Sequence, residues 1–271
     1  MADMADKMTN GEETILREGE RLDDTGFHGY RLIQKPEEFC YGVDAVLLAD
    51  FAARNVDPED GICDLRTGTG IVPLILAHKT ESRRIVGVEI QRDSWDRACR
   101  MTALNGLEDR LTFLWGDVAD IAASERSLEG LVPGSFRLVT SNPPYMAGPS
   151  GLKSENEAKR IARHETTAGL REFAAAAARL LDDRGEFCLV HRPSRLADIL
   201  EACRAVRLEP KELRLVAPRL EQKPNILLLR CRKNGGAELK VLPTLAVYGD
   251  DGRYSREIME IYERISPGSG D

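Results

Sequence analysis

The 271-residue sequence has no apolar run long enough to span a lipid bilayer. Its first twenty residues are acidic and polar and lack the basic and apolar regions of a secretory signal, so we expect a cytoplasmic protein. No CxxC pair is present either. The six cysteines are widely spaced, which argues against a zinc site or a disulfide framework and indicates reduced, mostly buried thiols. We therefore expect neither a membrane nor a metal among its partners.

Positive charge is in deficit, with 38 Lys and Arg against 45 Asp and Glu, a formal net charge of −7. By itself this balance argues against a nucleic-acid partner. The charge is unevenly spread, however, because residues 151–233 hold 18 Lys and Arg against 12 Asp and Glu. This segment is compatible both with a local basic face and with charge scattered over the surface.

The composition, with 42% hydrophobic and 31% charged residues, is that of an ordinary globular protein with one sizeable core. From residue 57 to 266, short apolar strands alternate with helical stretches, a pattern typical of a parallel α/β sheet. The predicted strands are 61–65, 84–90, 111–117, 136–142, 186–192, 213–218 and 225–232. The predicted helices between them are 71–78, 92–105 and 170–181. Only a short turn joins the last two strands, so we expect them to pair antiparallel at the sheet edge.

The ends of the chain differ from this domain. Residues 21–56 are predicted to form a small N-terminal element, with a hairpin around 27–33 and a helix from 44 to 53. Residues 1–20 and the tail 267–271 are predicted to be disordered.

A glycine-rich turn, DLRTGTG (64–70), follows the first predicted strand and opens a helix. Glycine lets the backbone approach a ligand, and a helix N-terminus offers unpaired N–H groups, although many ordinary turns share these features. Two acidic residues add to the pattern. Glu89 ends the second strand, where a carboxylate can accept both ribose hydroxyls, and Asp117 ends the third, within reach of an adenine amino group. The three strand ends together predict a cofactor that contains adenosine.

Two cofactor classes share this geometry. A dinucleotide usually requires GxGxxG, whereas this sequence reads TGTGIVP without the third glycine. S-adenosyl-L-methionine has no phosphate, and the turn resembles the D/E-x-G-x-G-x-G motif of class I methyltransferases, with Arg66 at the first glycine position. If that position needs a left-handed backbone, arginine costs about 1–2 kcal/mol there. Its side chain could instead pair with the cofactor carboxylate.

The tetrapeptide Asn142-Pro143-Pro144-Tyr145 directly follows the fourth strand. Ligands of open α/β sheets bind beyond the carboxyl ends of the strands, where the strand order reverses. In the methyltransferase order the first and fourth strands are neighbours there. We therefore expect Asn142 to face the same crevice as the glycine-rich turn.

This tetrapeptide suits methyl transfer to a conjugated exocyclic amine, which is a poor nucleophile. The Asn142 side-chain oxygen and the Pro143 carbonyl can accept both amine hydrogens and stabilise the charge that develops. The proline rings keep the carbonyl aimed, and Tyr145 offers a flat surface to a flipped-out base. The alternative is a rigid turn that happens to hold an aromatic residue.

Several segments together resemble the bacterial tRNA adenine-N6-methyltransferases that modify the adenosine 3′ of the anticodon (position 37) of a valine tRNA. The likeness extends from about residue 20 to 262, and its segments are 29–54, 64–70, SNPPY, ARHETT, LVHRPSRLADIL and LEPKELRLVAPR. It implies a Rossmann-like sheet of seven strands, the last antiparallel, and assigns methyl transfer to Asn142–Tyr145. It also implies a set of S-adenosyl-L-methionine contacts: Tyr41, Asp44, Asp64, Arg66, Gly68, Gly70, Glu89, Asp117, Val118 and Asn142.

RNA, specifically tRNA, is the partner that this resemblance implies, and we expect the protein to be a monomer or weak dimer. The candidate phosphate contacts are basic residues near the predicted pocket: Lys153, Lys159, Arg160, Arg163, His164, Arg192, Arg195 and Lys223. A solvated surface role is an equally good account of any one of them.

Two other functions remain open. One is a protein-glutamine methyltransferase of the release-factor type, which shares NPPY. The other is a relative that binds cofactor or RNA without turnover because of Arg66.

Overall fold

The computed structural model describes residues 15–37, 40–123, 128–143 and 168–264. A small antiparallel hairpin comes first, formed by β1 (Arg21–Asp24) and β2 (Arg31–Gln34). Helix α2 (Val43–Ala52) follows it and leads into the main sheet. The predicted N-terminal element is therefore confirmed as a hairpin and a helix. Residues 15–20 precede it, and Glu20 forms an ion pair with Arg100 at 2.7 Å, so the packed part of the chain begins before residue 21.

The main sheet has the order β10-β8-β9-β7-β6-β3-β4-β5, with β11 also paired to β8. Its first four strands in the chain are β3 (Gly61–Leu65), β4 (Arg84–Glu89), β5 (Leu111–Trp115) and β6 (Phe136–Ser141). The later strands are β7 (Leu181–His191), β8 (Leu208–Ala217), β9 (Ile226–Lys233), β10 (Lys240–Val241) and β11 (Leu245–Ala246). All pairs are parallel except those of β9 with β7 and β8.

This order confirms the expected α/β class and the antiparallel pairing of the last two predicted strands. The strand count of seven was wrong, because β10 and β11 add two parallel pairs beyond β8. Each has only two residues, too few for a periodic pattern. Two boundaries also differ. β7 and β8 begin five residues earlier than predicted, in stretches that contain several charged residues.

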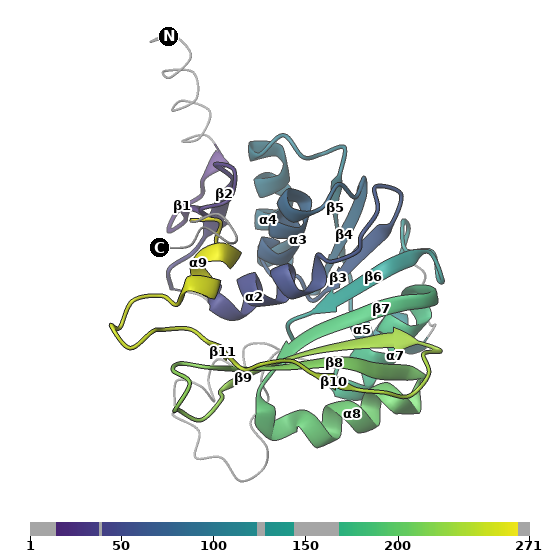
Figure 1. The fold of residues 1–271 in the computed structure, drawn as a ribbon. Coiled ribbons are helices and arrows are strands. Elements are labelled where there is room, and N and C mark those ends of the chain that lie inside the picture. The colour runs from purple at the N-terminus through teal and green to yellow at the C-terminus, as the bar shows by residue number, and fades with distance from the viewer. Residues whose placement is uncertain (1–14, 38–39, 124–127, 144–167, 265–271) are drawn as a thin grey trace.

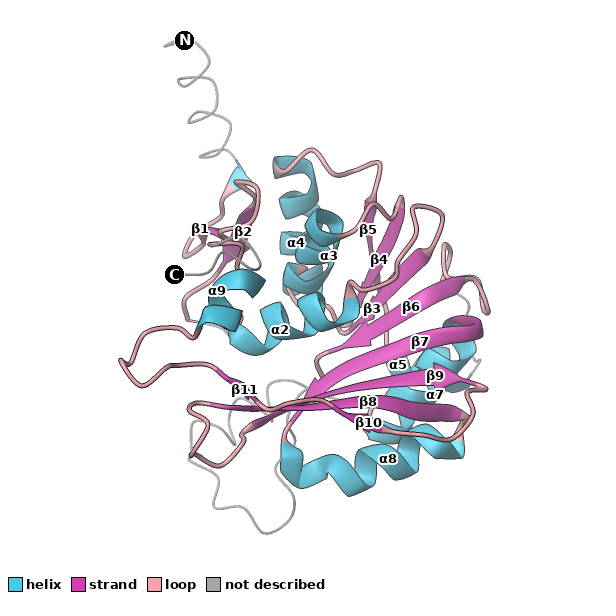
Figure 2. Cartoon of the chain, viewed as in Figure 1, coloured by secondary structure: helices cyan, strands magenta, loops and turns pink. Residues whose placement is uncertain are grey.

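Helices cover both faces of the sheet (Figures 1 and 2). On one face lie α2, α3 (Ile71–Lys79), α4 (Arg92–Leu104) and α9 (Arg256–Ile261). On the other lie α5 (Val118–Ala123), α7 (Leu170–Leu180) and α8 (Leu196–Ala205), the last preceded by a 3₁₀ turn over Pro193–Arg195. Each face has its own apolar cluster, which explains why β3 is buried along its whole length. None of the cysteines forms a disulfide, and four of the six are buried.

Candidate active site

The carboxyl ends of β3, β4, β5 and β6 meet at one edge of the sheet. Leu65 pairs with both Val88 and Ser141, and Glu89 pairs with Trp115. The Ser141 hydroxyl donates a hydrogen bond to the Leu65 carbonyl at 3.0 Å, which ties the ends of β3 and β6 together. The glycine-rich turn and Asn142 therefore leave the sheet side by side, as the sequence predicts.

The turn after β3 has a left-handed backbone at three of its residues. Arg66, Gly68 and Gly70 have φ angles of 62°, 61° and 87°. Gly70 also lacks room for a side chain, because a Cβ there would lie 2.8 Å from atoms of Met101 and Phe113. A Cβ on Gly68 would meet nothing within 4 Å, so the backbone is open on that side. Arg66 thus does occupy a backbone conformation that costs arginine about 1–2 kcal/mol.

Glu89 holds the turn in place. Its side chain is buried, and its carboxylate accepts hydrogen bonds from the N–H of Gly68 at 2.8 Å and from the N–H of Gln91 at 2.7 Å. The carboxylate therefore joins the end of β4 to the turn after β3. This double backbone contact is a structural role that the sequence did not reveal.

Arg66 lies near the carboxylates at the ends of β4 and β5. Burial lowers the pKa of its guanidinium, and the charges of Glu89 and Asp117 partly offset that effect. The Asp117 carboxylate also accepts the N–H of Ala119 at 2.9 Å, at the start of α5. Val118 is the buried first residue of that helix. Arg66 is therefore close enough to Glu89 and Asp117 for their charges to act on its guanidinium.

Asp64 is the last but one residue of β3 and is almost completely buried. Burial, with a smaller contribution from the charge of Glu89, raises the pKa of its carboxyl to about 7, although a hydrogen bond from Thr140 acts in the opposite direction. The Thr140 hydroxyl donates that bond to the Asp64 carboxylate at 2.6 Å. Asp64 is therefore a group whose charge changes close to neutral pH.

Asp64→Asn is expected to make protein stability less dependent on pH. The pKa of Asp64 rises from 3.8 to about 7 on folding, so the folded state binds the proton more tightly. The resulting stabilisation of the folded state is complete below the pKa of the unfolded state. It is lost as the pH rises through the pKa of the folded state, and the free energy of unfolding then falls by up to about 1.4 kcal/mol per pH unit. Urea unfolding at about pH 5 and about pH 8 measures it, and the variant should gain stability over the wild type at the higher pH. An equal difference at both pH values would contradict this assignment.

The side chain of Asn142 contacts helix α2. Its Nδ2 donates a hydrogen bond to the Asp44 carboxylate at 3.3 Å. Asp44 lies in the first turn of α2, where a negative charge is favourable next to the helix N-terminus. Because the amide nitrogen faces Asp44, the amide oxygen is left for a different partner. Pro143 is buried next to it, whereas Pro144 and Tyr145 lie outside the described residues.

Tyr41 precedes α2 and packs against the first apolar cluster. Burial raises the pKa of its hydroxyl, and the charges of Asp23 and Asp24 on the N-terminal hairpin raise it further. The hairpin and the start of α2 are therefore adjacent parts of one element, which contacts Asn142 through Asp44.

Three candidate RNA contacts lie at the same sheet edge as Asn142. Arg192 follows β7, Arg195 ends the 3₁₀ turn after it, and Lys223 lies in the turn between β8 and β9. Arg195 forms an ion pair with Asp198 at 2.6 Å. The other five lie outside the described residues: Lys153, Lys159, Arg160, Arg163 and His164.

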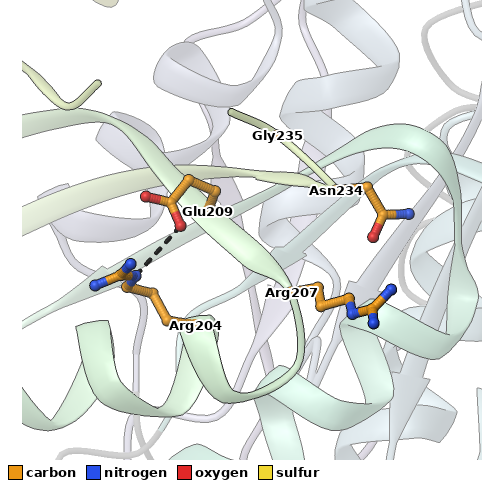
Figure 3. Close-up of a pocket in the computed structure, with 5 residues that line it drawn as sticks. All are labelled: Arg204, Arg207, Glu209, Asn234 and Gly235. Atoms are coloured by element: carbon orange, nitrogen blue, oxygen red, sulfur yellow. Dashed lines mark hydrogen bonds and ion pairs between the residues drawn. The ribbon is translucent and has the colours of Figure 1, made fainter. Parts of the chain in front are cut away.

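A solvent-open hollow of about 600 Å³ lies at the opposite edge of the sheet, where β8 begins and β9 ends (Figure 3). The residues that line it are Arg204, Arg207, Glu209, Asn234 and Gly235. Arg204 and Glu209 pair there at 3.2 Å. None of these residues lies at the edge that holds the predicted site.

Among the described residues, no group of three or more His, Cys, Asp or Glu could hold a metal ion, and no helix is long and apolar enough to cross a membrane.

Known structures show the same fold at low sequence identity. A predicted O-methyltransferase from Agrobacterium tumefaciens has a TM-score of 0.64 and 22% identity, over 81% of this chain and 95% of its own. TYW2 of M. jannaschii, solved in complex with AdoMet, has a TM-score of 0.54 and 12% identity, over 80% and 87%. These similarities establish a Rossmann-like methyltransferase fold.

Sequence relatives are more specific, although no model of a protein family matches the chain. A tRNA1(Val) (adenine(37)-N6)-methyltransferase of Porphyromonas gingivalis is 30% identical over 229 residues, which cover 82% of this chain and 86% of the relative. A protein of the same name from Aeromonas hydrophila is 25% identical, over 81% of this chain and 87% of the relative. With its strand order and site geometry, the chain belongs to the tRNA1(Val) (adenine(37)-N6)-methyltransferase family.

Proposed function

We propose that this protein transfers a methyl group from S-adenosyl-L-methionine to N6 of adenine 37 in a valine tRNA. The observation that carries the proposal is the direct adjacency of the glycine-rich turn and Asn142 at the ends of two paired strands. Membership of the tRNA1(Val) (adenine(37)-N6)-methyltransferase family supports the same function. The substrate is a tRNA, and we accordingly place the protein in the cytoplasm, as a monomer or weak dimer.

The residues at the carboxyl ends of these strands fit this cofactor better than a dinucleotide. Carboxylates lie at the ends of three strands and at the start of α2: Asp44, Asp64, Glu89 and Asp117. They would repel a pyrophosphate and attract a ligand that carries a sulfonium and an ammonium group. Arg66 is the cation described among them. The open backbone at Gly68 leaves room for a ligand to approach the turn.

The cofactor, when bound, supplies an electrophilic methyl carbon on a sulfonium. The protein's part is to hold the adenine amine in line with it and to stabilise the positive charge that develops on nitrogen. The Asn142 amide oxygen and the Pro143 carbonyl are suited to accept the two amine hydrogens. Asp44 acts on the other side of the amide, because its hydrogen bond to Nδ2 sets which amide atom faces the substrate. The proton leaves to solvent after transfer.

Nucleoside mass spectrometry of tRNA tests this function. In cells that lack the protein, N6-methyladenosine at position 37 of the valine tRNA should disappear, and the purified protein should restore it on the unmodified tRNA. A transcript with guanosine at that position is the matched control and should accept no methyl group. An unchanged level of N6-methyladenosine in the deleted strain would overturn the proposal.

A further inference from the structure

Two exposed tyrosines stack on each other in the segment between β11 and α9. The ring centroids of Tyr248 and Tyr254 are 5.4 Å apart, and their planes differ by only 11°. Their exposed fractions are 40% and 38%. We call this pair the tyrosine platform. Stacking covers the inner faces of the two rings, so the outer face of Tyr248 and the ring edges are what the pair presents to a partner.

Backbone hydrogen bonds make the tyrosine platform rigid. The Tyr248 N–H donates to the Pro218 carbonyl at 2.9 Å, and the Gly249 N–H donates to the Arg253 carbonyl at 2.9 Å. Behind it, Tyr254 stacks on the half-buried Tyr262 at 6.0 Å with planes 9° apart. A ring held in this way loses little conformational entropy when a partner binds to it.

The platform lies at the edge of the sheet that carries the active site. Pro218 directly follows β8, which runs parallel to β7 and ends at the same edge as Asn142. Three strand spacings separate β8 from β6, roughly 15 Å. Helix α9 also packs on α2, the helix that carries Asp44. The platform and the proposed methyl-transfer site therefore lie at the same edge of the sheet.

The charges around the platform are mixed. Arg219 and Lys223 lie in the adjacent turn after β8, and Arg253 has a side chain that is 89% exposed. Acidic residues offset part of this charge, since Asp250 is exposed and Asp251 lies 4.0 Å from Arg253, while Arg264 lies 6.0 Å from the centre of the Tyr254 ring. These mixed charges give a phosphate no strong attraction, whereas a flat neutral ring would find the outer face of Tyr248, which is backed by the stacked rings of Tyr254 and Tyr262.

We propose that the tyrosine platform stacks with an unpaired base of the anticodon loop while the target adenine is in the active site; this rests on the proposed function. A methyltransferase must take its target base out of the stack, and its neighbours in the loop then lose a stacking partner. Aromatic side chains replace such partners in single-stranded RNA, and every base has a face that can stack. The platform supplies such faces within reach of the same loop.

Fluorescence anisotropy with the unmodified anticodon stem-loop of the valine tRNA tests this. Tyr248→Ala should raise the Kd for the RNA by about 5- to 100-fold, the range for one lost stacking contact, and Tyr254→Ala should also weaken binding because it removes the ring that backs Tyr248. Tyr254→Phe and Tyr248→Phe keep the ring and should bind as the wild type does. Tyr254→Leu keeps bulk without a flat face and should behave like the alanine variant. Calorimetric titration with S-adenosyl-L-methionine should give the same affinity for all variants, which shows that the fold and site are intact.

Abasic scanning of the loop identifies the partner base. Removal of that base should weaken binding to the wild type but not to Tyr248→Ala. A wild type that methylates the tRNA while the alanine variants bind as tightly would overturn the platform and leave the proposed function standing. A wild type that neither binds nor methylates the tRNA would overturn both.

Discussion

Replacement of Asn142 by alanine is expected to lower kcat for adenine methylation by about 100-fold or more, the usual effect of losing one group that stabilises charge in the transition state. The amide oxygen interacts with the amine most strongly when positive charge develops, so the loss falls on kcat. The affinity for S-adenosyl-L-methionine should stay close to that of the wild type. Three of the carboxylates proposed to bind it, Asp64, Glu89 and Asp117, and the glycine-rich turn are held by contacts that do not involve the amide.

Single-turnover kinetics and calorimetric titration separate these two quantities. Asp44→Ala is the matched variant, because it removes the hydrogen bond that orients the amide while the amide itself remains. Its kcat is expected to lie between those of the wild type and Asn142→Ala. Equal losses of cofactor affinity and kcat in Asn142→Ala would contradict the assigned role.

Most of the sheet could be predicted because its strands are buried and separated by helical stretches. β3 was predicted with its correct bounds, since GICDL is apolar apart from one acid and has a turn on each side. The short strands β10 and β11 have no such pattern and exist only because β8 offers them an edge. Helix α9 has only six residues and depends on burial of Ile258 and Ile261 against distant parts of the chain. Such elements are set by tertiary contact, not by local sequence.

The site was predicted in outline for a similar reason. Glycines and acids at strand ends must meet at one edge of a parallel sheet, so Gly68, Glu89 and Asn142 could be grouped from their positions alone. The hydrogen-bond partners of these side chains could not be predicted. The pairing of Asn142 with Asp44 joins residues 98 positions apart, and no periodicity connects a helix start to a strand end. The left-handed backbone of Arg66 was considered from its glycine-like position and is confirmed by the structure.

A buried ionic cluster anchors α2 to the sheet on the side away from Asn142. The side chain of Arg230, on β9, is only 5% exposed and pairs with Glu186 on β7. Its guanidinium also donates to the Phe51 carbonyl near the end of α2, and it lies 5.1 Å from the centre of the Phe51 ring. Burial raises the pKa of Glu186, but Arg232 and Arg230 outweigh it and leave that pKa below its usual value. The carboxylate is therefore charged and depends on its partners.

Arg230→Leu is expected to lower the free energy of unfolding by about 3 kcal/mol, the low end of the usual cost of removing one partner from a buried ion pair. Glu186 would keep Arg232 at 2.6 Å, which places the effect at that lower end, while the Phe51 carbonyl would lose its donor. Urea unfolding measures the change. Arg232→Leu is the matched control, because its side chain is 41% exposed on the same strand, and a half-exposed pair should cost about 1 kcal/mol or less.

The double variant Arg230→Leu with Glu186→Leu shows why Arg230→Leu is destabilising. The cause is either the lost attraction between the two groups or the buried Glu186 carboxylate left without its partner. If most of the cost comes from leaving Glu186 buried and incompletely paired, removing both groups should recover part of the stability lost in Arg230→Leu. Equal costs for Arg230→Leu and Arg232→Leu would show that burial adds nothing to this cluster. Because α2 carries Asp44 at its other end, Arg230→Leu should also lower kcat toward that of Asp44→Ala, whereas Arg232→Leu should leave kcat unchanged.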